Sequence, residues 1–183
     1  MRYGFVGRNE VLPQGRAVFA QQIHQDKIYD VRDILVERLE VDGYDALVTR
    51  QKDLLLVIKM ADCAPLLFYD AVTETIAAAH AGRVGTNLGI AEKTVEHLAK
   101  NHSIRPSDLR VIIGPSICVN CYQIDRAKDL HYDLWAENKK QLERAGVRNI
   151  EITGLCTACN AHERFYSYRR EKTALRNFAY ITL

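Results

Sequence analysis

Cys63 and His80 are the residues of this chain whose types and spacing most directly suggest chemistry. They lie in residues 60–85, MADCAPLLFYDAVTETIAAAHAGRVG, where two apolar runs joined by a short polar hinge predict a β-hairpin. If the turn is centred between Ala71 and Val72, Cys63 and His80 face each other with their Cβ atoms about 4.5–5.5 Å apart. A thiolate and an imidazole at that separation can share a metal ion or act as a nucleophile and its base.

The neighbours of this pair favour a functional site over a buried thiol and an ordinary strand histidine. Asp62 places a carboxylate beside the thiol, and Pro65 removes a backbone donor from the strand. Gly82 and Gly85 follow the imidazole, where the lack of side chains lets the backbone approach a ligand closely. We therefore expect a metal site or a catalytic pair here.

The rest of the sequence predicts the strands and helices that would hold this site. Residues 54–60, LLLVIKM, are a continuous apolar run typical of a buried strand, which would deliver residues 61–63 at its end, where ligands commonly bind. His24 lies between two further predicted strands. Besides 54–60 and the hairpin, strands are predicted at 16–23, 27–31, 45–49, 109–113, 150–153 and 177–183, and helices at 87–101, capped by Thr86 or Asn87, and at 126–145, ended by Gly146.

The composition is that of an ordinary globular protein. The chain has 183 residues, 48% of them hydrophobic and 26% charged, which predicts one domain over residues 1–183. At a net charge of +2, positive and negative residues are interspersed, so we expect no nucleic-acid partner but a small anionic one bound by local arginines. We also expect no membrane partner, because neither a membrane span nor a signal peptide is recognisable. Five cysteines, an odd number, predict reduced thiols and a cytoplasmic location.

Two Cys-x-x-Cys pairs, Cys118/Cys121 and Cys156/Cys159, are a second group of candidate ligands. Such pairs often form four-cysteine structural zinc sites. Here neither pair has a glycine-rich knuckle, and a predicted long helix separates the two. The sequence favours a thiol cluster or core packing, with a four-cysteine zinc site as the alternative.

Aromatic and basic residues alternate near the C-terminus. Tyr166, Tyr168, Arg169 and Arg170 could form a stacking and anion-binding edge for a nucleoside-sized ligand. Ordinary packing of tyrosine against arginine explains the same pattern, and these residues alone leave both interpretations open.

A series of ordered motifs resembles the laccase-domain proteins, a family once called multicopper polyphenol oxidases and now regarded as purine nucleoside phosphorylases with adenosine deaminase activity. The motifs are QQIHQDKI, DALVT, ADCAPLLFYD, AAAHAG, IGPSI, CYQI, DLWAENKKQL, CTACN and FYSYRR, and they cover the chain from about Gln21 to its end. The resemblance implies an α+β fold of packed mixed β-sheets flanked by helices. It also implies a zinc ion held by His24, Cys63 and His80.

The chain departs from the family pattern in two places. It reads HAGRVG where the family usually has HAGWRG, so the tryptophan is absent and Arg83 stands one place before the expected arginine. It also begins closer to the first histidine motif than its relatives do. Both departures concern the pocket and therefore the substrate range.

The ligand set favours zinc over copper. Three nitrogen and sulfur ligands with an open fourth position are the arrangement of a catalytic zinc. A trinuclear copper cluster would need more histidines than remain in the chain, which are His97, His102, His131 and His162. Zinc is the expected cofactor, with copper the less favoured metal.

The resemblance thus implies a zinc-dependent purine nucleoside phosphorylase that also deaminates adenosine. Its substrates would be phosphate and adenosine, inosine, guanosine or methylthioadenosine, and it would be a monomer or a homodimer. Asp62 would carry a proton, and Arg83 or Arg169 would hold phosphate as a bidentate fork. The residues assigned to catalysis are Asp62, Cys63 and Arg83, and those assigned to substrate binding are Tyr166, Arg169 and Arg170.

Two other functions use the same residues. Cys63 as the nucleophile and His80 as the base would make a cysteine hydrolase or deamidase, with His24 assisting. A metal-binding domain without enzymatic activity is the third reading. Bound zinc would distinguish the phosphorylase from the cysteine hydrolase. Binding of a nucleoside would distinguish the phosphorylase from a metal-binding domain without activity.

Overall fold

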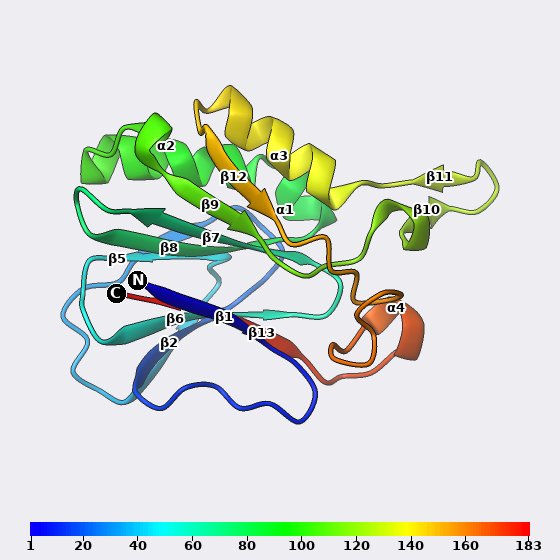
Figure 1. The fold of residues 1–183 in the computed structure, drawn as a ribbon, viewed down its shortest axis with the longest axis horizontal. Helices are drawn as coiled ribbons and strands as arrows, with labels where there is room; N and C mark the ends of the chain where they lie inside the picture. The colour runs from blue at the N-terminus through cyan, green and yellow to red at the C-terminus, as the bar shows by residue number, and fades with distance from the viewer.

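The computed structural model describes residues 1–183 as two packed β-sheets with helices over the outer face of one of them (Figure 1), which confirms the expected α+β fold. The five-stranded sheet consists, in spatial order, of β1 (Arg2–Val6), β13 (Asn177–Thr182), β6 (Leu54–Met60), β2 (Arg16–Gln21) and β4 (Arg38–Asp42). The six-stranded sheet consists of β12 (Asn149–Ile152), β9 (Arg110–Ile113), β7 (Ala64–Asp70), β8 (Thr75–Ala81), β5 (Ala46–Thr49) and β3 (Ile28–Asp30). The remaining elements are the ribbon of β10 (Gln123–Asp125) and β11 (Leu130–His131), the helices α1 (Arg83–Asn87), α2 (Ile90–His102), α3 (Leu134–Arg144) and α4 (Tyr168–Glu171), and the 3-10 turns η1 (Pro106–Asp108) and η2 (Val119–Cys121).

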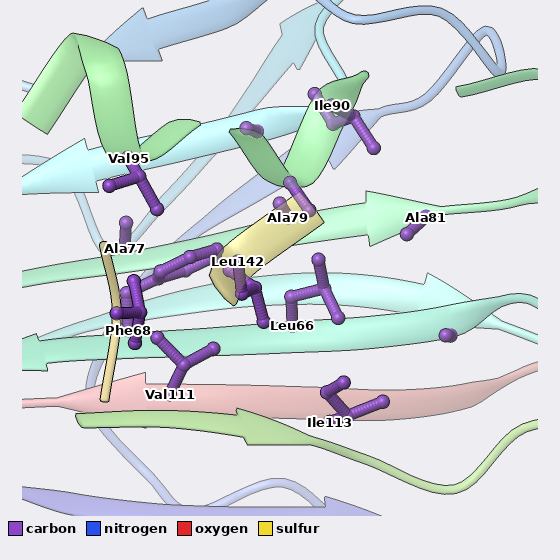
Figure 2. Packing of buried hydrophobic residues seen from close by; sticks show 14 of the residues in the cluster. Leu66, Phe68, Ala77, Ala79, Ala81, Ile90, Val95, Val111, Ile113 and Leu142 are labelled. Carbon is purple, nitrogen blue, oxygen red and sulfur yellow. The ribbon is translucent and has the colours of Figure 1, made fainter. Parts of the chain in front are cut away.

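Alternating residues of the central strands build two cores. On β7, Leu66 and Phe68 belong to the core under the helices, whereas Leu67 belongs to the core between the two sheets. Figure 2 shows the first of these cores, in which Val95 of α2 and Leu142 of α3 pack with the strand residues. Because β7 and β8 are buried on both faces, the hairpin is a rigid support for whatever its ends carry.

The hairpin is confirmed, but its predicted register is wrong. Pro65, not Cys63, pairs with His80, and Asp70 pairs with Thr75 at the turn. The Asp70 carboxylate accepts hydrogen bonds from the backbone N–H and the hydroxyl of Thr73, which moves the turn toward the C-terminus. Cys63 therefore lies just before β7 rather than opposite the histidine.

The predicted helix over 126–145 is wrong in its first half, because α3 begins only at Leu134. The Asp133 side chain accepts a hydrogen bond from the backbone N–H of Ala136 and caps the helix there. Residues 126–129 instead form the turn between β10 and β11, where the Asp125 carboxylate accepts two backbone hydrogen bonds.

The helix predicted over 87–101 is confirmed as α2, but it begins only at Ile90, and a separate short helix, α1, precedes it. Gly89, with φ of 85°, separates α1 from α2, so neither Thr86 nor Asn87 is a cap. The edge strands β1 and β4 were not predicted, since their apolar patterns are short. None of the helices combines the length and the apolar character that crossing a membrane requires.

Candidate metal centre and active site

His24, Cys63 and His80 come together at one edge of the two sheets. β2 and β6 run parallel in register, so both end at the same edge of the five-stranded sheet. His24 follows β2, Cys63 follows β6, and His80 lies near the end of β8. The ligand atoms of the three side chains lie within 4.8 Å of one another, and the two imidazole rings are 4.7 Å apart at 86°. The three residues could therefore hold a metal ion, as the family resemblance implies.

Asp45 fixes the orientation of the buried histidine. Its Oδ1 atom lies 2.9 Å from Nδ1 of His80, and both side chains are almost completely buried. This contact leaves Nε2 of His80 free to face a metal. Asp45 and His80 therefore fit the carboxylate–histidine–metal arrangement common in metal sites. The same carboxylate accepts hydrogen bonds from the backbone N–H groups of Ile23, His24 and Gln25 and so also holds the loop of the second histidine.

The electrostatics of the pair favour a Cys63 thiolate, and they favour a protonated His80 that must lose its Nε2 proton to bind a metal. Burial raises the pKa of the Cys63 thiol, but the charge of His80 and hydrogen bonds from both histidines outweigh it and lower the pKa to about 6. Burial lowers the pKa of His80, whereas the Cys63 thiolate and the Asp45 carboxylate raise it to about 9. Cys63 is thus a thiolate at neutral pH, which is the form that binds metals and attacks electrophiles.

Gly82 leaves room beside the thiolate. A Cβ atom at this position would lie 2.9 Å from Sγ of Cys63 and 3.3 Å from Cδ2 of His24. Contacts this short would force the thiolate away from the histidines. The missing side chain and the nitrogen and sulfur donors both fit a metal at this point. They support the expectation that Gly82 lets the backbone approach a ligand closely.

Asp62 stands beside the thiolate in a constrained conformation. Its φ of 92° lies in the left-handed region that residues other than glycine rarely adopt, and His24 has φ of 61°. The Asp62 carboxylate accepts one hydrogen bond from the Thr157 hydroxyl at 2.8 Å and another from the backbone N–H of Arg169 at 2.6 Å. Each oxygen keeps a lone pair for a further partner.

A cavity of about 790 Å3 opens over these residues. The charged side chains that line it, apart from the histidines and the thiolate, are Asp62, Lys59, Arg169, Lys172 and Arg176. Four cationic side chains against one carboxylate make the cavity suitable for an anion. Tyr122 and Tyr168 also line it and offer aromatic surfaces.

Three residues assigned to the site from the sequence do not line this cavity. Arg83 is exposed at the start of α1. Nη1 of Arg170 lies 3.5 Å from the carbonyl oxygen of Ala158, and the ring of Tyr166 stacks on the guanidinium of Arg8 at 4.2 Å. Their roles in substrate binding stay predictions.

The sequence analysis missed Asp45 and three of the cavity's cations, Lys59, Lys172 and Arg176. Asp45 opens the motif DALVT, and an acidic residue directly before a buried strand was the available signal. The cations carried no such signal, since isolated lysines and arginines are common on surfaces.

The donor groups do not support copper oxidation. The three groups of adjacent histidine, cysteine and acidic side chains contain at most two histidines each, and His97 and His102 belong with Asp30 in a separate group. A trinuclear copper cluster needs more histidines in one place.

The fold and the site together define a two-sheet α+β protein with a two-histidine, one-cysteine group at a cationic cavity. The family model described as multi-copper polyphenol oxidoreductase laccase matches residues 6–130 and 125–183. The chain belongs to this laccase-like family, as the motifs predict.

Relatives and solved structures agree with this assignment. A Deinococcus radiodurans protein named purine nucleoside phosphorylase is 34% identical over an alignment of 166 positions, and the match covers 79% of this chain and 64% of that protein. The Bacillus subtilis purine nucleoside phosphorylase YlmD is 31% identical over an alignment of 184 positions, gaps included, and the match covers 85% of this chain and 66% of the relative. This chain thus spans about two thirds of these relatives' length.

The fold is also that of two solved structures. The Bacillus licheniformis hypothetical protein YfiH matches with a TM-score of 0.84 and 32% identity, covering 91% of this chain and 74% of that chain. YlmD from Geobacillus stearothermophilus matches with a TM-score of 0.82 and 32% identity, covering 93% of this chain and 74% of that chain.

Proposed function

We propose that this protein is a zinc-dependent purine nucleoside phosphorylase that cleaves nucleosides such as adenosine, inosine, guanosine and methylthioadenosine with phosphate. The observation that carries the proposal is the position of the His24, Cys63 and His80 group in a cavity that also presents four cationic side chains. Relatives named purine nucleoside phosphorylase support the reaction class.

The cations of the cavity would hold phosphate where it can attack the ribose carbon. Arg169 is the proposed fork of the two arginines that line the cavity, because Nη1 of the other, Arg176, already donates to backbone carbonyl groups. Attack forms the bond from phosphate to the ribose carbon and breaks the bond to the purine nitrogen. The products are ribose 1-phosphate and the free base, and the base would lie against the aromatic walls of the cavity.

Asp62 is the residue proposed to move a proton. It is the only carboxylic side chain in the cavity wall. Hydrogen bonds from the Thr157 hydroxyl and the Arg169 backbone N–H hold it in place beside Cys63. A zinc ion bound by the three ligands would act as a Lewis acid and lower the pKa of a bound water. The same site would support deamination of adenosine, with Asp62 in the part that a glutamate takes in known zinc deaminases.

Replacing Arg169 by glutamine should raise the phosphate KM or lower kcat about tenfold to a hundredfold, since a charge-assisted hydrogen bond contributes roughly 1.5–3 kcal/mol. Arg169→Lys should recover part of this loss, because it restores the charge but not the fork. Steady-state kinetics at varied phosphate, with zinc content measured in parallel, check both effects. Deamination needs no phosphate and should largely survive.

Arg83→Gln is the matched comparison for this experiment. From the sequence both Arg83 and Arg169 are candidate phosphate ligands, and the exposure of Arg83 outside the cavity wall favours Arg169. A phosphate effect in Arg83→Gln and none in Arg169→Gln would return the role to Arg83. Equal loss of phosphorolysis and deamination in Arg169→Gln would contradict a specific role in phosphate binding.

A cysteine hydrolase or deamidase is the second candidate, and one observation favours it. The lowered pKa of Cys63 and the raised pKa of His80 also describe a reactive thiolate with its imidazolium. That mechanism requires no third ligand. Selective alkylation of Cys63 that abolishes activity in a protein free of bound metal would favour it over the phosphorylase.

A further inference from the structure

The two Cys-x-x-Cys pairs come together at a second site, separate from the group of His24, Cys63 and His80. The sulfur atoms of Cys118, Cys121, Cys156 and Cys159 all lie within 4.8 Å of one another. A parallel bridge between Ser116 and Cys156 brings the two segments together, with hydrogen bonds from the Ser116 N–H to the Leu155 carbonyl and from the Thr157 N–H to the Ser116 carbonyl. We propose that these four cysteines bind a structural zinc ion.

Hydrogen bonds shape the turn of each cysteine pair without glycine. The carbonyl of Cys118 accepts hydrogen bonds from the N–H groups of Cys121 and Tyr122, which closes a turn between the two sulfurs of the pair. In the second pair, the Asn160 side chain accepts a hydrogen bond from the Cys156 N–H and donates one to the Gly154 carbonyl. Both turns are therefore built by hydrogen bonds, and the objection raised by the missing glycines does not apply.

The sulfur geometry fits one tetrahedral ion. Sγ of Cys118 lies 3.8 Å from Sγ of Cys159. Four sulfurs each about 2.3 Å from a central zinc are about 3.8 Å apart, whereas a disulfide requires about 2.05 Å. A multi-iron cluster would spread its cysteines more widely, so a single ion fits this set better.

The donor set indicates a site whose coordination the protein completes by itself. Cys156 is buried, Cys118 and Cys121 are half-buried and Cys159 is exposed. The protein supplies all four ligands, which is the arrangement of structural rather than catalytic zinc. The backbone N–H of Cys118 also points to Sγ of Cys156 at 3.3 Å, a contact that stabilises a thiolate.

This second ion would position the first site, an effect that rests on the proposed function. Thr157 lies inside the second pair and donates its hydroxyl hydrogen to Asp62. Ile117 precedes the first pair, donates its backbone N–H to the Asp62 carbonyl and lines the cavity, and Tyr122 follows the pair and lines it as well. A zinc that joins the two pairs would therefore fix both the proton carrier and a wall of the cavity.

Metal counting on the full chain tests this site. Wild-type protein prepared with zinc and a reductant should hold two zinc ions per chain by elemental analysis and native mass spectrometry. The variant Cys118→Ser with Cys159→Ser should hold one, and the variant His24→Ala with Cys63→Ser should also hold one, from the other site. One zinc in the wild type that the first double variant retains would overturn the proposal.

Cobalt reconstitution keeps the test decisive if the serine variant does not fold. Co2+ added to the variant His24→Ala with Cys63→Ser should give the intense visible absorption and the sulfur-to-cobalt charge transfer of tetrahedral thiolate coordination. Weak absorption, or a disulfide between Cys118 and Cys159 in the native protein, would overturn the proposal. The zinc count does not depend on catalysis, so two ions without phosphorolysis would refute the proposed function alone.

Discussion

Replacing any one of His24, Cys63 or His80 by alanine should abolish zinc binding at the candidate active site and lower phosphorolysis by at least about a hundredfold. Each residue supplies one of only three protein ligands, and loss of a group that merely supports a ligand already costs about 10- to 100-fold in metal affinity or activity. Elemental analysis and steady-state kinetics on the three variants measure the two effects.

His131→Ala is the matched control, because His131 lies on β11 outside all the groups of candidate ligands. It should keep the metal content and the activity of the wild type. Full activity in Cys63→Ala would contradict both the metal centre and the cysteine hydrolase. Activity lost only in Cys63→Ala and His80→Ala, with no metal in the wild type, would favour the hydrolase.

Asp45→Asn should have the second largest effect, although this residue does not face the cavity. The asparagine amide has one acceptor oxygen in place of two. It therefore cannot accept hydrogen bonds from Nδ1 of His80 and from all three backbone N–H groups at once. We expect zinc affinity to fall about 10- to 100-fold. The free energy of unfolding should also fall by roughly 1–3 kcal/mol, because buried donors lose their partner.

Competition with a zinc chelator gives the affinity, and urea unfolding of the metal-free protein gives the stability. Asp42→Asn, at the exposed end of β4, is the control and should change neither quantity. Unchanged zinc affinity in Asp45→Asn would show that His80 needs no carboxylate to hold its orientation.

The sequence predicts the ligands better than the geometry that joins them. Cys63 and His80 come together even though the predicted register is wrong, because Cys63 directly precedes Ala64, which pairs with Ala81 next to His80. The position of the turn depends on how the Asp70 side chain bonds to Thr73, and a pattern of apolar residues does not contain that information.

The helices and the cavity were harder to predict for related reasons. Apolar spacing alone extended α3 over residues 126–133, where turn-forming aspartates compete successfully with the helix. Arg83 is close to His80 in sequence, but α1 begins there and carries it to the surface, whereas Arg169 reaches the cavity from a distant part of the chain. Contacts between residues so far apart depend on the packing of whole sheets.

Phosphate dependence is the most direct test of the proposed reaction. Zinc-loaded wild-type protein is incubated with inosine in the presence and absence of phosphate, and hypoxanthine and ribose 1-phosphate are both quantified. The proposed function predicts that the two products appear in equal amounts and only when phosphate and the metal are both present. Absence of hypoxanthine release under those conditions, or release that does not depend on phosphate, would contradict it.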